Sequence, residues 1–313
     1  MIFTDLLTIA MPCYERKDFF LAALESALNQ TVKCKIIVVD NCSSHNYFEK
    51  VCKEKNVPYY RNEINIGIAG NFSRTVELSD TKYVMNLQDD DKLHPQYVES
   101  FLKAVNLHPD IDIFFSNFEA DTSRGIVPHH HTLPFGYMGN GAKIIEYAIK
   151  YKMGFPYMTS AIKKSKAHSA KEVSDMVGSY DWEWIYSHAN ELSFYGDSKK
   201  LYLYRLHDQQ HTSVEASIYK LSLPYIYDNI LKEKVSDDKL KKIASNNAFW
   251  ELVILKSSAD KNKILEYLNG NSKYSYYLKS KLKENIMLHM IFFTHKVFVM
   301  LVYKTIRKVG LIS

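Results

Sequence analysis

Apolar runs and helix-spaced segments alternate along the first third of the chain. Leu6–Met11 is a mostly apolar run that predicts a buried strand, which we expect to end at Pro12. Lys35–Asp40 predicts a second strand, and Phe19–Ala27 between them has the spacing of a helix. The residues expected on the buried face of that helix are Phe20, Leu21, Leu24 and Leu28. Because parallel strands need a long crossover, usually a helix, this order predicts an α/β fold with a parallel sheet.

A third apolar run leads into a cluster of carboxylates. Tyr83–Leu93 joins strand-like residues to the three consecutive acids Asp89–Asp91. Like charges this close are costly unless a cation neutralises them, and a hard divalent ion carrying phosphate is the usual partner. A solvated turn is the alternative, because Asp clusters also cap helices and turns. Open sheets bind ligands beyond the carboxyl ends of their strands, so Pro12, Tyr14, Asp40 and the acids are expected to line one crevice.

Five segments resemble the opening of family-2 glycosyltransferases, in the order that this family has them. They are Thr8–Tyr14, Leu24–Thr31, Ile37–Ser43, Asn65–Phe72 and the acidic run that ends at Pro95. The resemblance implies a GT-A fold, in which a nucleotide-binding α/β half continues into an acceptor-binding half. It also implies an inverting sugar transfer from a nucleotide-sugar donor with Mg²⁺ or Mn²⁺.

The same resemblance implies an organisation of the chain and roles for residues of the donor site. Residues 1–215 would form the catalytic domain, with 1–100 binding the nucleotide-sugar and 101–215 the acceptor, and 216–313 a helical C-terminal extension. In this family, residues that match Tyr14 stack on the donor base, Pro12 shapes that pocket, and Asp40 accepts a hydrogen bond from the base. The imide N–H of uracil or thymine is a suitable donor for Asp40. The residues that match the ribose loop and the helix after it are Asn65, Gly67 and Asn71.

The acidic run departs from the family pattern at one position. Family members commonly have Asp-x-Asp-Asp before the downstream proline, and anchoring on Pro95 puts Gln88 at the first Asp. Asp90 then takes the metal position, Asp91 supports it, and Asp89 lies near the ribose or diphosphate. A plain Asp-x-Asp alignment gives Asp89 and Asp91 instead. We expect Asp90 and Asp91 as the metal ligands.

A second acidic segment, Gly178–Trp184, is the candidate for the catalytic base. Sugar hydroxyls are weak nucleophiles, so a positioned carboxylate must take the proton during transfer. The family has an acid before a helix start that contains Asp-Trp, and Asp181 matches it best, with Glu183 second and a helix expected over Ile185–Asn190. A helix N-cap is the alternative role of Asp181. Two tryptophans fit either a stacking floor for an acceptor sugar or a core position: Trp182 and Trp184.

Histidines occur in two further segments. Leu203–Ser213 contains an Arg-x-His sequence that resembles the end of the catalytic domain in many relatives. There the resemblance implies His207 as a metal or diphosphate contact and Arg205 as a neutraliser of leaving-group charge. A purely structural role of His207 is the alternative. The loop with His129–His131 favours a surface or mobile segment over a metal-binding tract.

Composition is that of an ordinary globular enzyme. The chain has 313 residues, 46% hydrophobic, which is enough for a catalytic domain and a helical tail. Its four cysteines lack zinc spacing and its first residues do not resemble a signal peptide, so we expect a reducing, cytoplasmic location. The net charge of +5 comes with no nucleic-acid-binding motif, so we expect no nucleic acid partner.

The C-terminal part has a different pattern. After Ile218 the chain favours helices, including Asp237–Ser257 and Lys261–Leu268, and then has the apolar run Ile286–Tyr303 between basic flanks. Lys296 near its middle would cost about 3 kcal/mol in a spanning helix. We therefore expect an apolar helix that lies in the headgroup region of an anionic membrane, at the inner face of the plasma membrane. A helix packed on the catalytic domain or in a homodimer is the alternative.

These features together predict an enzyme with three candidate classes. The first is a metal-dependent inverting transferase that moves a hexosyl or N-acetylhexosaminyl group from a UDP-sugar to a glycan or lipid-linked glycan of a bacterial surface polysaccharide, such as capsule or lipopolysaccharide. A sugar-phosphate nucleotidyltransferase is the second, although it needs a Gly-rich basic loop where this chain has Pro12–Arg16. A non-catalytic nucleotide- or carbohydrate-binding module is the third, and Asp89–Asp91 with Asp181 argue against it.

Overall fold

The computed structural model describes most of the first two thirds of the chain. The described residues are 3–122, 125–129, 132–151, 155–167, 180–207, 236–238, 241–242, 245, 268–269 and 273–284. The chain divides into two compact units, Met1–Val173 with Trp184–Asp208 and Ser174–Glu183 with Gln209–Ser313. The predicted domain boundary at residue 215 stays a prediction, as do the tail helices, which lie mostly outside the described residues.

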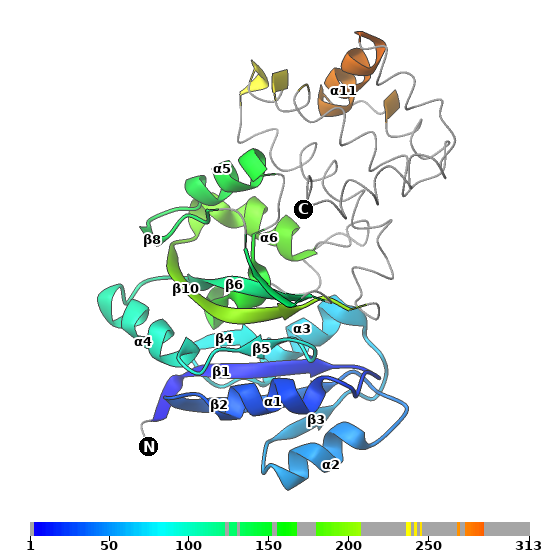
Figure 1. The fold of residues 1–313 in the computed structure, drawn as a ribbon, viewed down its shortest axis with the longest axis vertical. Coiled ribbons are helices and arrows are strands. Elements are labelled where there is room, and N and C mark those ends of the chain that lie inside the picture. Colours follow the sequence, from blue (N-terminus) through cyan, green and yellow to red (C-terminus); the bar gives the residue numbers. More distant parts are fainter. Residues whose placement is uncertain are drawn as a thin grey trace. The chain divides into compact units, whose positions relative to one another are not determined.

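A mixed sheet forms the centre of the first unit (Figure 1). Its strand order within the described residues is β3-β2-β1-β4-β9-β6-β10-β5, with β7 beside β6 and β8 beside β10. The strands are β1 (Phe3–Cys13), β2 (Lys33–Asp40), β3 (Tyr59–Arg61), β4 (Tyr83–Asn86), β5 (Lys92–Leu93), β6 (Ile113–Thr122), β7 (Gly125–Pro128), β8 (Gly136–Met138), β9 (Ala161–Lys163) and β10 (Phe194–Arg205). Pairing is parallel through β3-β2-β1-β4 and between β6 and β10, and antiparallel at the other pairs.

Helices cover this sheet and confirm the expected α/β class. The helices of the first unit within the described residues are α1 (Phe20–Leu28), α2 (Tyr47–Glu54), α3 (Gly67–Leu78), α4 (Tyr97–Leu107) and α5 (Ala142–Tyr151). The residues of α6 (Tyr180–His188) are divided between the two units, and α11 (Lys273–Glu284) belongs to the second unit. Within the part of the chain described, no helix is long and apolar enough to cross a bilayer. The apolar run Ile286–Tyr303 lies outside that part.

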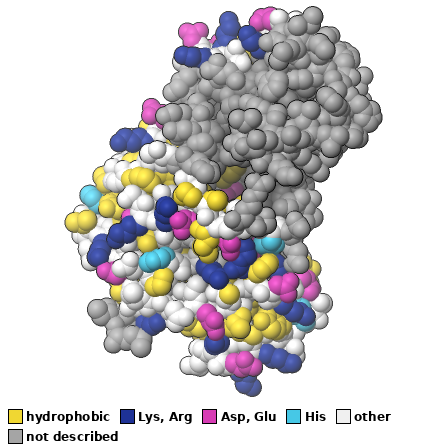
Figure 2. Space-filling view, in the orientation of Figure 1, with side chains coloured by type: hydrophobic (Ala, Val, Ile, Leu, Met, Phe, Trp, Pro, Cys, Tyr) yellow, Lys and Arg dark blue, Asp and Glu magenta, His cyan; other side chains and the backbone are white. Residues whose placement is uncertain are grey.

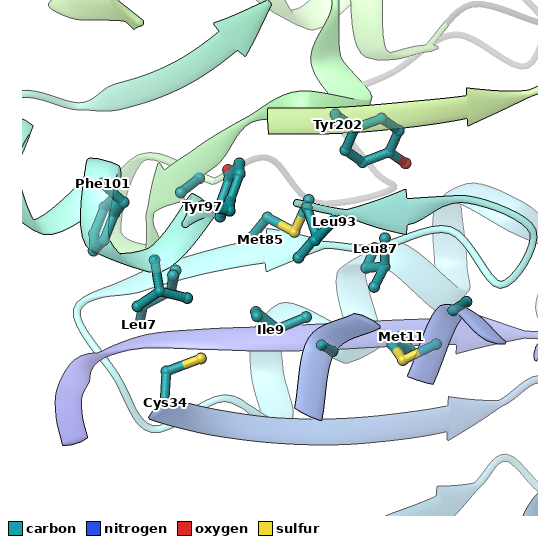
Figure 3. Packing of buried hydrophobic residues seen from close by; sticks show 14 of the residues in the cluster. Leu7, Ile9, Met11, Cys34, Met85, Leu87, Leu93, Tyr97, Phe101 and Tyr202 are labelled. Atoms are coloured by element: carbon teal, nitrogen blue, oxygen red, sulfur yellow. The ribbon is translucent and has the colours of Figure 1, made fainter. Parts of the chain in front are cut away.

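The two faces of the central strands have separate cores. Leu7, Ile9 and Met11 of β1 point to one face and pack with residues of β4, α1, α2 and α4 in the larger cluster, part of which Figure 3 shows. Ala10 points to the opposite face, in a smaller cluster against Val76 of α3. Side chains of a strand alternate between faces, so one mostly apolar strand supplies both cores. This double burial fixes the register of β1, β2 and β4.

Two local predictions were wrong. The first strand does not end at Pro12 but pairs with β2 as far as Cys13. The Ala10 carbonyl accepts a hydrogen bond from Leu87 on the side of β4. The nitrogen of Pro12, two residues later, faces the same side, but β4 has already ended there, so the absence of an N–H at Pro12 removes no pairing. Leu21 is not on the buried face of α1, since 38% of it is exposed. Ala23 and Ala27, with Phe20 and Leu24, form that face instead.

Candidate active site

The acidic turn after β4 lies at the carboxyl ends of the parallel strands. The Leu87 N–H bonds to the Ala10 carbonyl at 2.9 Å, and its fully buried side chain anchors the end of the strand. The chain then turns, with the Asp91 N–H bonded to the Gln88 carbonyl at 3.3 Å. Asp89, Asp90 and Asp91 are all buried at this turn. Three neighbouring buried acids therefore depend on partners from elsewhere in the chain.

Asp89 and Asp90 share one cationic partner, Arg16. Its guanidinium forms ion pairs with Asp89 and, at 2.9 Å, with the Asp90 Oδ2 atom. The His207 Nε2 atom lies 3.0 Å from the same Asp90 oxygen. Burial raises the pKa of Asp89 to about 7, although Arg16 acts in the opposite direction. Asp90 is thus the point where the turn after β1, the acidic turn and the end of β10 meet.

Asp91 has partners of another kind. The Tyr202 hydroxyl donates to one carboxylate oxygen at 2.7 Å, and the Arg205 backbone N–H donates to the other at 2.8 Å. The residue is fully buried, and this burial raises its pKa. Both oxygens tie β10 to the acidic turn, which positions His207 beside Asp90. A place for Asp91 in a metal shell stays a prediction.

The Phe19 ring packs against Arg205, the last residue of β10, and against His207 just after it. The Phe19 ring centroid lies 4.6 Å from that of His207 and 4.5 Å from the guanidinium carbon of Arg205. Such cation–π contacts contribute about 0.5–2 kcal/mol. The Arg205 Nε atom also lies 3.8 Å from an Asp121 oxygen. Arg205 and His207, both expected at the site from the sequence, are therefore brought to the acidic turn.

The carboxylate of Asp40, at the end of β2, accepts hydrogen bonds from neighbouring residues at both of its oxygens. The backbone N–H and hydroxyl of Ser43 bond to its Oδ1 atom at 3.0 and 2.6 Å. The Tyr59 hydroxyl bonds to its Oδ2 atom at 2.7 Å, and the residue has no exposed surface. A hydrogen bond from Asp40 to a donor base would have to replace one of these contacts. That role stays a prediction.

An asparagine network joins the loop after β2 to the start of α3. The Asn41 amide donates to the Asn65 oxygen at 2.8 Å, and the Gly67 N–H donates to that oxygen at 2.9 Å. Gly67 has φ of +75°, a conformation that suits glycine. Asn62 donates to the Asn71 side-chain oxygen at 2.9 Å. The sequence resemblance found Asn65, Gly67 and Asn71 but not Asn41 or Asn62, whose pairing appears only in three dimensions.

A pocket of about 380 Å³ opens beside this network. Its lining residues are Arg61, Asn62, Glu63, Ile64, Ile66 and Arg74. Its lining is mostly polar, with four charged or amide side chains and two isoleucines, whereas typical ligand pockets are mostly apolar. Tyr14, which follows β1, has 45% of its surface exposed, and Pro12 is half-buried within β1. Tyr14 therefore offers an accessible ring for stacking.

The candidate base lies in the second compact unit. Asp181 and Glu183 are in the first turn of α6, which begins at Tyr180 rather than at the expected Ile185. The first turn of a helix favours carboxylates because unpaired N–H groups point toward them. Burial nevertheless raises the pKa of Asp181 to about 7. The structure does not place Asp181 relative to the acidic turn, so its catalytic role stays a prediction.

Other candidates from the sequence have structural roles. Trp184 is buried and contacts the His188 ring, so it takes the core position that was one of its two alternatives. His129 lies 2.8 Å from the Tyr147 hydroxyl and packs on Phe118. The two histidines after it are outside the described residues.

The residues at Asp90 fit a metal ion whose coordination shell is completed by the substrate. Asp90 and His207 offer one carboxylate and one imidazole nitrogen, with contacting atoms 3.0 Å apart. No group of three or more His, Cys, Asp or Glu within the described residues has metal-binding geometry. Mg²⁺ and Mn²⁺ commonly take one or two protein ligands and fill their shells with phosphate oxygens and water. The residues thus suit an ion that arrives with a diphosphate.

Basic and acidic side chains are interspersed on the visible face of the first unit (Figure 2).

The model of the family described as "Glycosyl transferase family 2" matches residues 8–166, about half of the chain. The chain belongs to this family. The match covers β1 to β9, and with it the acidic turn and both loops of the asparagine network.

Individual glycosyltransferases agree with this assignment. An uncharacterised glycosyltransferase of Methanocaldococcus jannaschii is 24% identical over 79% of this chain and 84% of its own length. One from Haemophilus influenzae is 31% identical over 35% of this chain and 38% of its own length. WcaA of Escherichia coli, named for colanic acid biosynthesis, is 26% identical over 31% of this chain and 37% of its own length.

Solved structures confirm the fold. The chain matches S. aureus TarS 1–349 in complex with UDP-GlcNAc with a TM-score of 0.63 and 15% identity, over 97% of this chain and 92% of that one. The match to the UDP complex of the same protein has a TM-score of 0.54 and 13% identity, with the same coverage. The expected GT-A architecture, a central sheet flanked by helices, is thereby confirmed for this family-2 glycosyltransferase.

Proposed function

We propose that this glycosyltransferase moves a sugar from a UDP-sugar to a hydroxyl group of a glycan or lipid-linked glycan, with inversion and with Mn²⁺ or Mg²⁺. The observation that carries the proposal is the pair Asp90 and His207, 3.0 Å apart at the carboxyl ends of the parallel strands. Arg16 supplies positive charge at the Asp90 oxygen, and the Arg205 guanidinium packs on Phe19, whose ring contacts His207. Metal ions and guanidinium groups can each neutralise the charge of a diphosphate leaving group.

The donor nucleoside is assigned to the pocket beside the asparagine network. Arg61 and Arg74 line it together with exposed isoleucines, and Tyr14 presents its ring after β1. TarS, which shares the fold, has been crystallised with UDP-GlcNAc and with UDP. This likeness in fold is the reason for choosing uridine as the first nucleoside to test.

The transfer step is assigned to Asp181. Its carboxylate takes the proton of the acceptor hydroxyl while that oxygen attacks the anomeric carbon. The bond from the anomeric carbon to the diphosphate breaks on the opposite face, and its electrons leave with UDP. A divalent ion, when bound, would neutralise the charge that develops on this leaving group. Arg205 adds a fixed positive charge, and the packing of Phe19 keeps that guanidinium in place.

The decisive test separates the three candidate classes in one reaction mixture. The protein is incubated with UDP-GlcNAc or UDP-glucose, Mn²⁺ and a soluble glycan acceptor, and the products are resolved by NMR. A transferase releases UDP and forms a glycoside of inverted anomeric configuration. With added pyrophosphate, a nucleotidyltransferase would instead form UTP and a sugar 1-phosphate. Thermal stabilisation by every nucleotide-sugar without turnover of any would indicate a binding module.

The proposed acceptor and cellular location rest on the pattern of the C-terminal segment. We place the enzyme at the inner face of the plasma membrane with a lipid-linked acceptor of surface polysaccharide synthesis, because Ile286–Tyr303 is apolar between basic flanks. The likeness to WcaA, named for colanic acid biosynthesis, agrees with such an acceptor.

Liposome sedimentation tests the tail. The full chain should bind vesicles with anionic lipid more than neutral ones, and salt should weaken this difference because it screens Lys and Arg charges. Deletion after Lys283 should abolish binding and leave transfer to a soluble acceptor. A full chain that stays in the supernatant with every lipid, paired with a truncated form that unfolds, would make the segment a packed or dimer helix.

A further inference from the structure

Arg16 is the cation nearest to the acidic turn among the contacts described there. Its guanidinium pairs with Asp89 and, at 2.9 Å, with the Asp90 Oδ2 atom. That oxygen also faces the His207 Nε2 atom at 3.0 Å. Neither the periodicity of the chain nor the motif resemblance pointed to Arg16, because it lies 73 residues from Asp89 in sequence. Its position is a product of the fold.

The turn that carries Arg16 is held on both sides. Glu15 has φ of +56°, a left-handed conformation that is unusual for a residue with a side chain. The Ser43 hydroxyl accepts a hydrogen bond from the Glu15 N–H at 2.9 Å. The Glu15 carboxylate in turn accepts bonds from the Ser44 N–H and hydroxyl, at 2.6 and 2.9 Å. Strained backbone of this kind persists where surrounding contacts over-determine it, and it commonly marks functional sites.

Arg16 and a divalent ion need the same oxygen. An ion held by Asp90 and His207 would lie against the Asp90 Oδ2 atom, the oxygen that the guanidinium now pairs with. Two cations this close repel each other strongly at a buried site. The ion pair and the metal shell are therefore alternatives, and Arg16 needs another anion if it is to leave Asp90. A diphosphate brought by the donor is an anion of suitable geometry, because guanidinium groups bind phosphate oxygens bidentately.

We propose that Arg16 is a positioning residue that competes with the divalent ion for Asp90 and passes to the donor diphosphate when the ion binds. Metal binding is thereby coupled to donor binding, and the ion is taken up weakly until the nucleotide arrives. The inference rests on the proposed function, since it requires a metal and a nucleotide diphosphate at this site. It adds to that function an order of binding and a residue responsible for it.

The test measures Mn²⁺ affinity by electron paramagnetic resonance, with and without UDP. Without UDP, Arg16→Gln should bind Mn²⁺ about tenfold more tightly than the parent, a typical size for the coupling between two sites. UDP should raise Mn²⁺ affinity in the parent by a larger factor than in Arg16→Gln. Lys103→Gln is the matched control, because it removes one positive charge from α4, where Lys103 pairs only with Glu99 among its described ion pairs.

Further variants keep the test decisive if Arg16→Gln fails to fold. The double variant Arg16→Gln/Asp89→Asn removes the cation together with one buried acid, and it should show the same loss of coupling. Arg16→Lys should lie between parent and Gln, because an ammonium group keeps the charge but cannot bridge two carboxylates in the same way. Equal Mn²⁺ affinity and equal UDP coupling in all these proteins would overturn the inference and leave metal-dependent transfer standing. Absence of Mn²⁺ binding in the parent, with and without UDP, would overturn both.

Discussion

The ends of β2 and β4 both carry buried carboxylates, but their partners differ in kind. Asp40, the last residue of β2, accepts hydrogen bonds from the hydroxyls of Ser43 and Tyr59 and from a backbone N–H, and the Arg61 guanidinium lies 3.8 Å from its Oδ2 atom. At the end of β4, Asp90 is instead contacted by Arg16 and His207, which reach it from two other segments. The first arrangement relies on short hydrogen bonds from neutral donors, with a guanidinium group at a longer distance. The second uses a guanidinium and an imidazole whose positions depend on distant parts of the fold.

From this difference we expect Asp90 to exchange its partners for ligands more readily than Asp40 does. Hydrogen bonds from neutral donors to a fully buried carboxylate must break before a ligand can bind that carboxylate. Breaking them leaves a buried polar group unsatisfied, which costs free energy. Cationic partners can be exchanged for a metal ion and a diphosphate without leaving the carboxylate unneutralised. Asp91 resembles Asp40 in this respect, because Tyr202 and a backbone N–H occupy its oxygens. Within the acidic turn, we therefore expect Asp89 and Asp90 to exchange partners more readily than Asp91.

The largest expected effect comes from Asp90→Asn. Loss of this ligand should abolish the thermal stabilisation by UDP with Mn²⁺ and lower turnover by about 10³–10⁴-fold, because metal ions contribute several kcal/mol to charged transition states. Circular dichroism should remain that of the parent. Asp80→Asn is the matched control, since Asp80 is an exposed acid paired with Lys35. Binding of UDP and Mn²⁺ by the Asp90 variant at parental affinity would remove the distinction between the two strand ends.

The next effect concerns the carboxylate on α6. Asp181→Asn keeps the shape of the side chain but cannot accept a proton, so turnover should fall by about 10²–10⁴-fold while donor affinity is retained. In the parent, turnover should rise tenfold per pH unit below about pH 7 and level off above it, because Asp181 has a pKa of about 7 and acts as the base only when ionised. Parental turnover in Asp181→Asn, with a loss in Glu183→Gln, would move the role to Glu183.

The same variant gives a stability prediction of opposite sign. The pKa of Asp181 is raised in the folded protein, so the folded state holds this proton more tightly than the unfolded chain does. Stability from this group is therefore present at low pH and is lost as pH rises from about 4 to about 7. Asp181→Asn should be more stable than the parent at pH 8, and the difference in melting temperature should vanish near pH 4. A variant less stable than the parent at pH 8 would contradict the raised pKa.

The smallest effects concern Asp40 and Asp91, whose carboxylates each accept a hydrogen bond from a tyrosine hydroxyl. Tyr59→Phe and Tyr202→Phe each remove one hydroxyl donor from a buried acid, and each should lower the free energy of unfolding by about 1–3 kcal/mol. Only Tyr202→Phe should also weaken the stabilisation by UDP with Mn²⁺, because Asp91 holds the segment that carries His207. Urea unfolding and thermal shift measurements check the two effects separately. Equal loss of ligand stabilisation in both variants would mean that the ends of β2 and β4 are not functionally different.

Much of the fold was accessible from local patterns. The apolar runs predicted β1, β2 and β4, and the 3.6-residue spacing predicted α1, because the alternation of buried and exposed positions is written into neighbouring residues. The acidic run and the motif resemblance located the site at the ends of these strands. Local patterns failed at Leu21, since the width of a buried helix face depends on what packs against it.

The sequence by itself determined the α/β class, the family and the acids of the site, because these depend on residue type and order. Only the tertiary structure decided what each acid contacts. Arg16 reaches Asp89 across 73 residues, and Tyr202 reaches Asp91 across 111. A carboxylate's charge, burial and freedom to bind a metal depend on such partners. Adjacent acids therefore differ in their partners although they are equivalent in sequence.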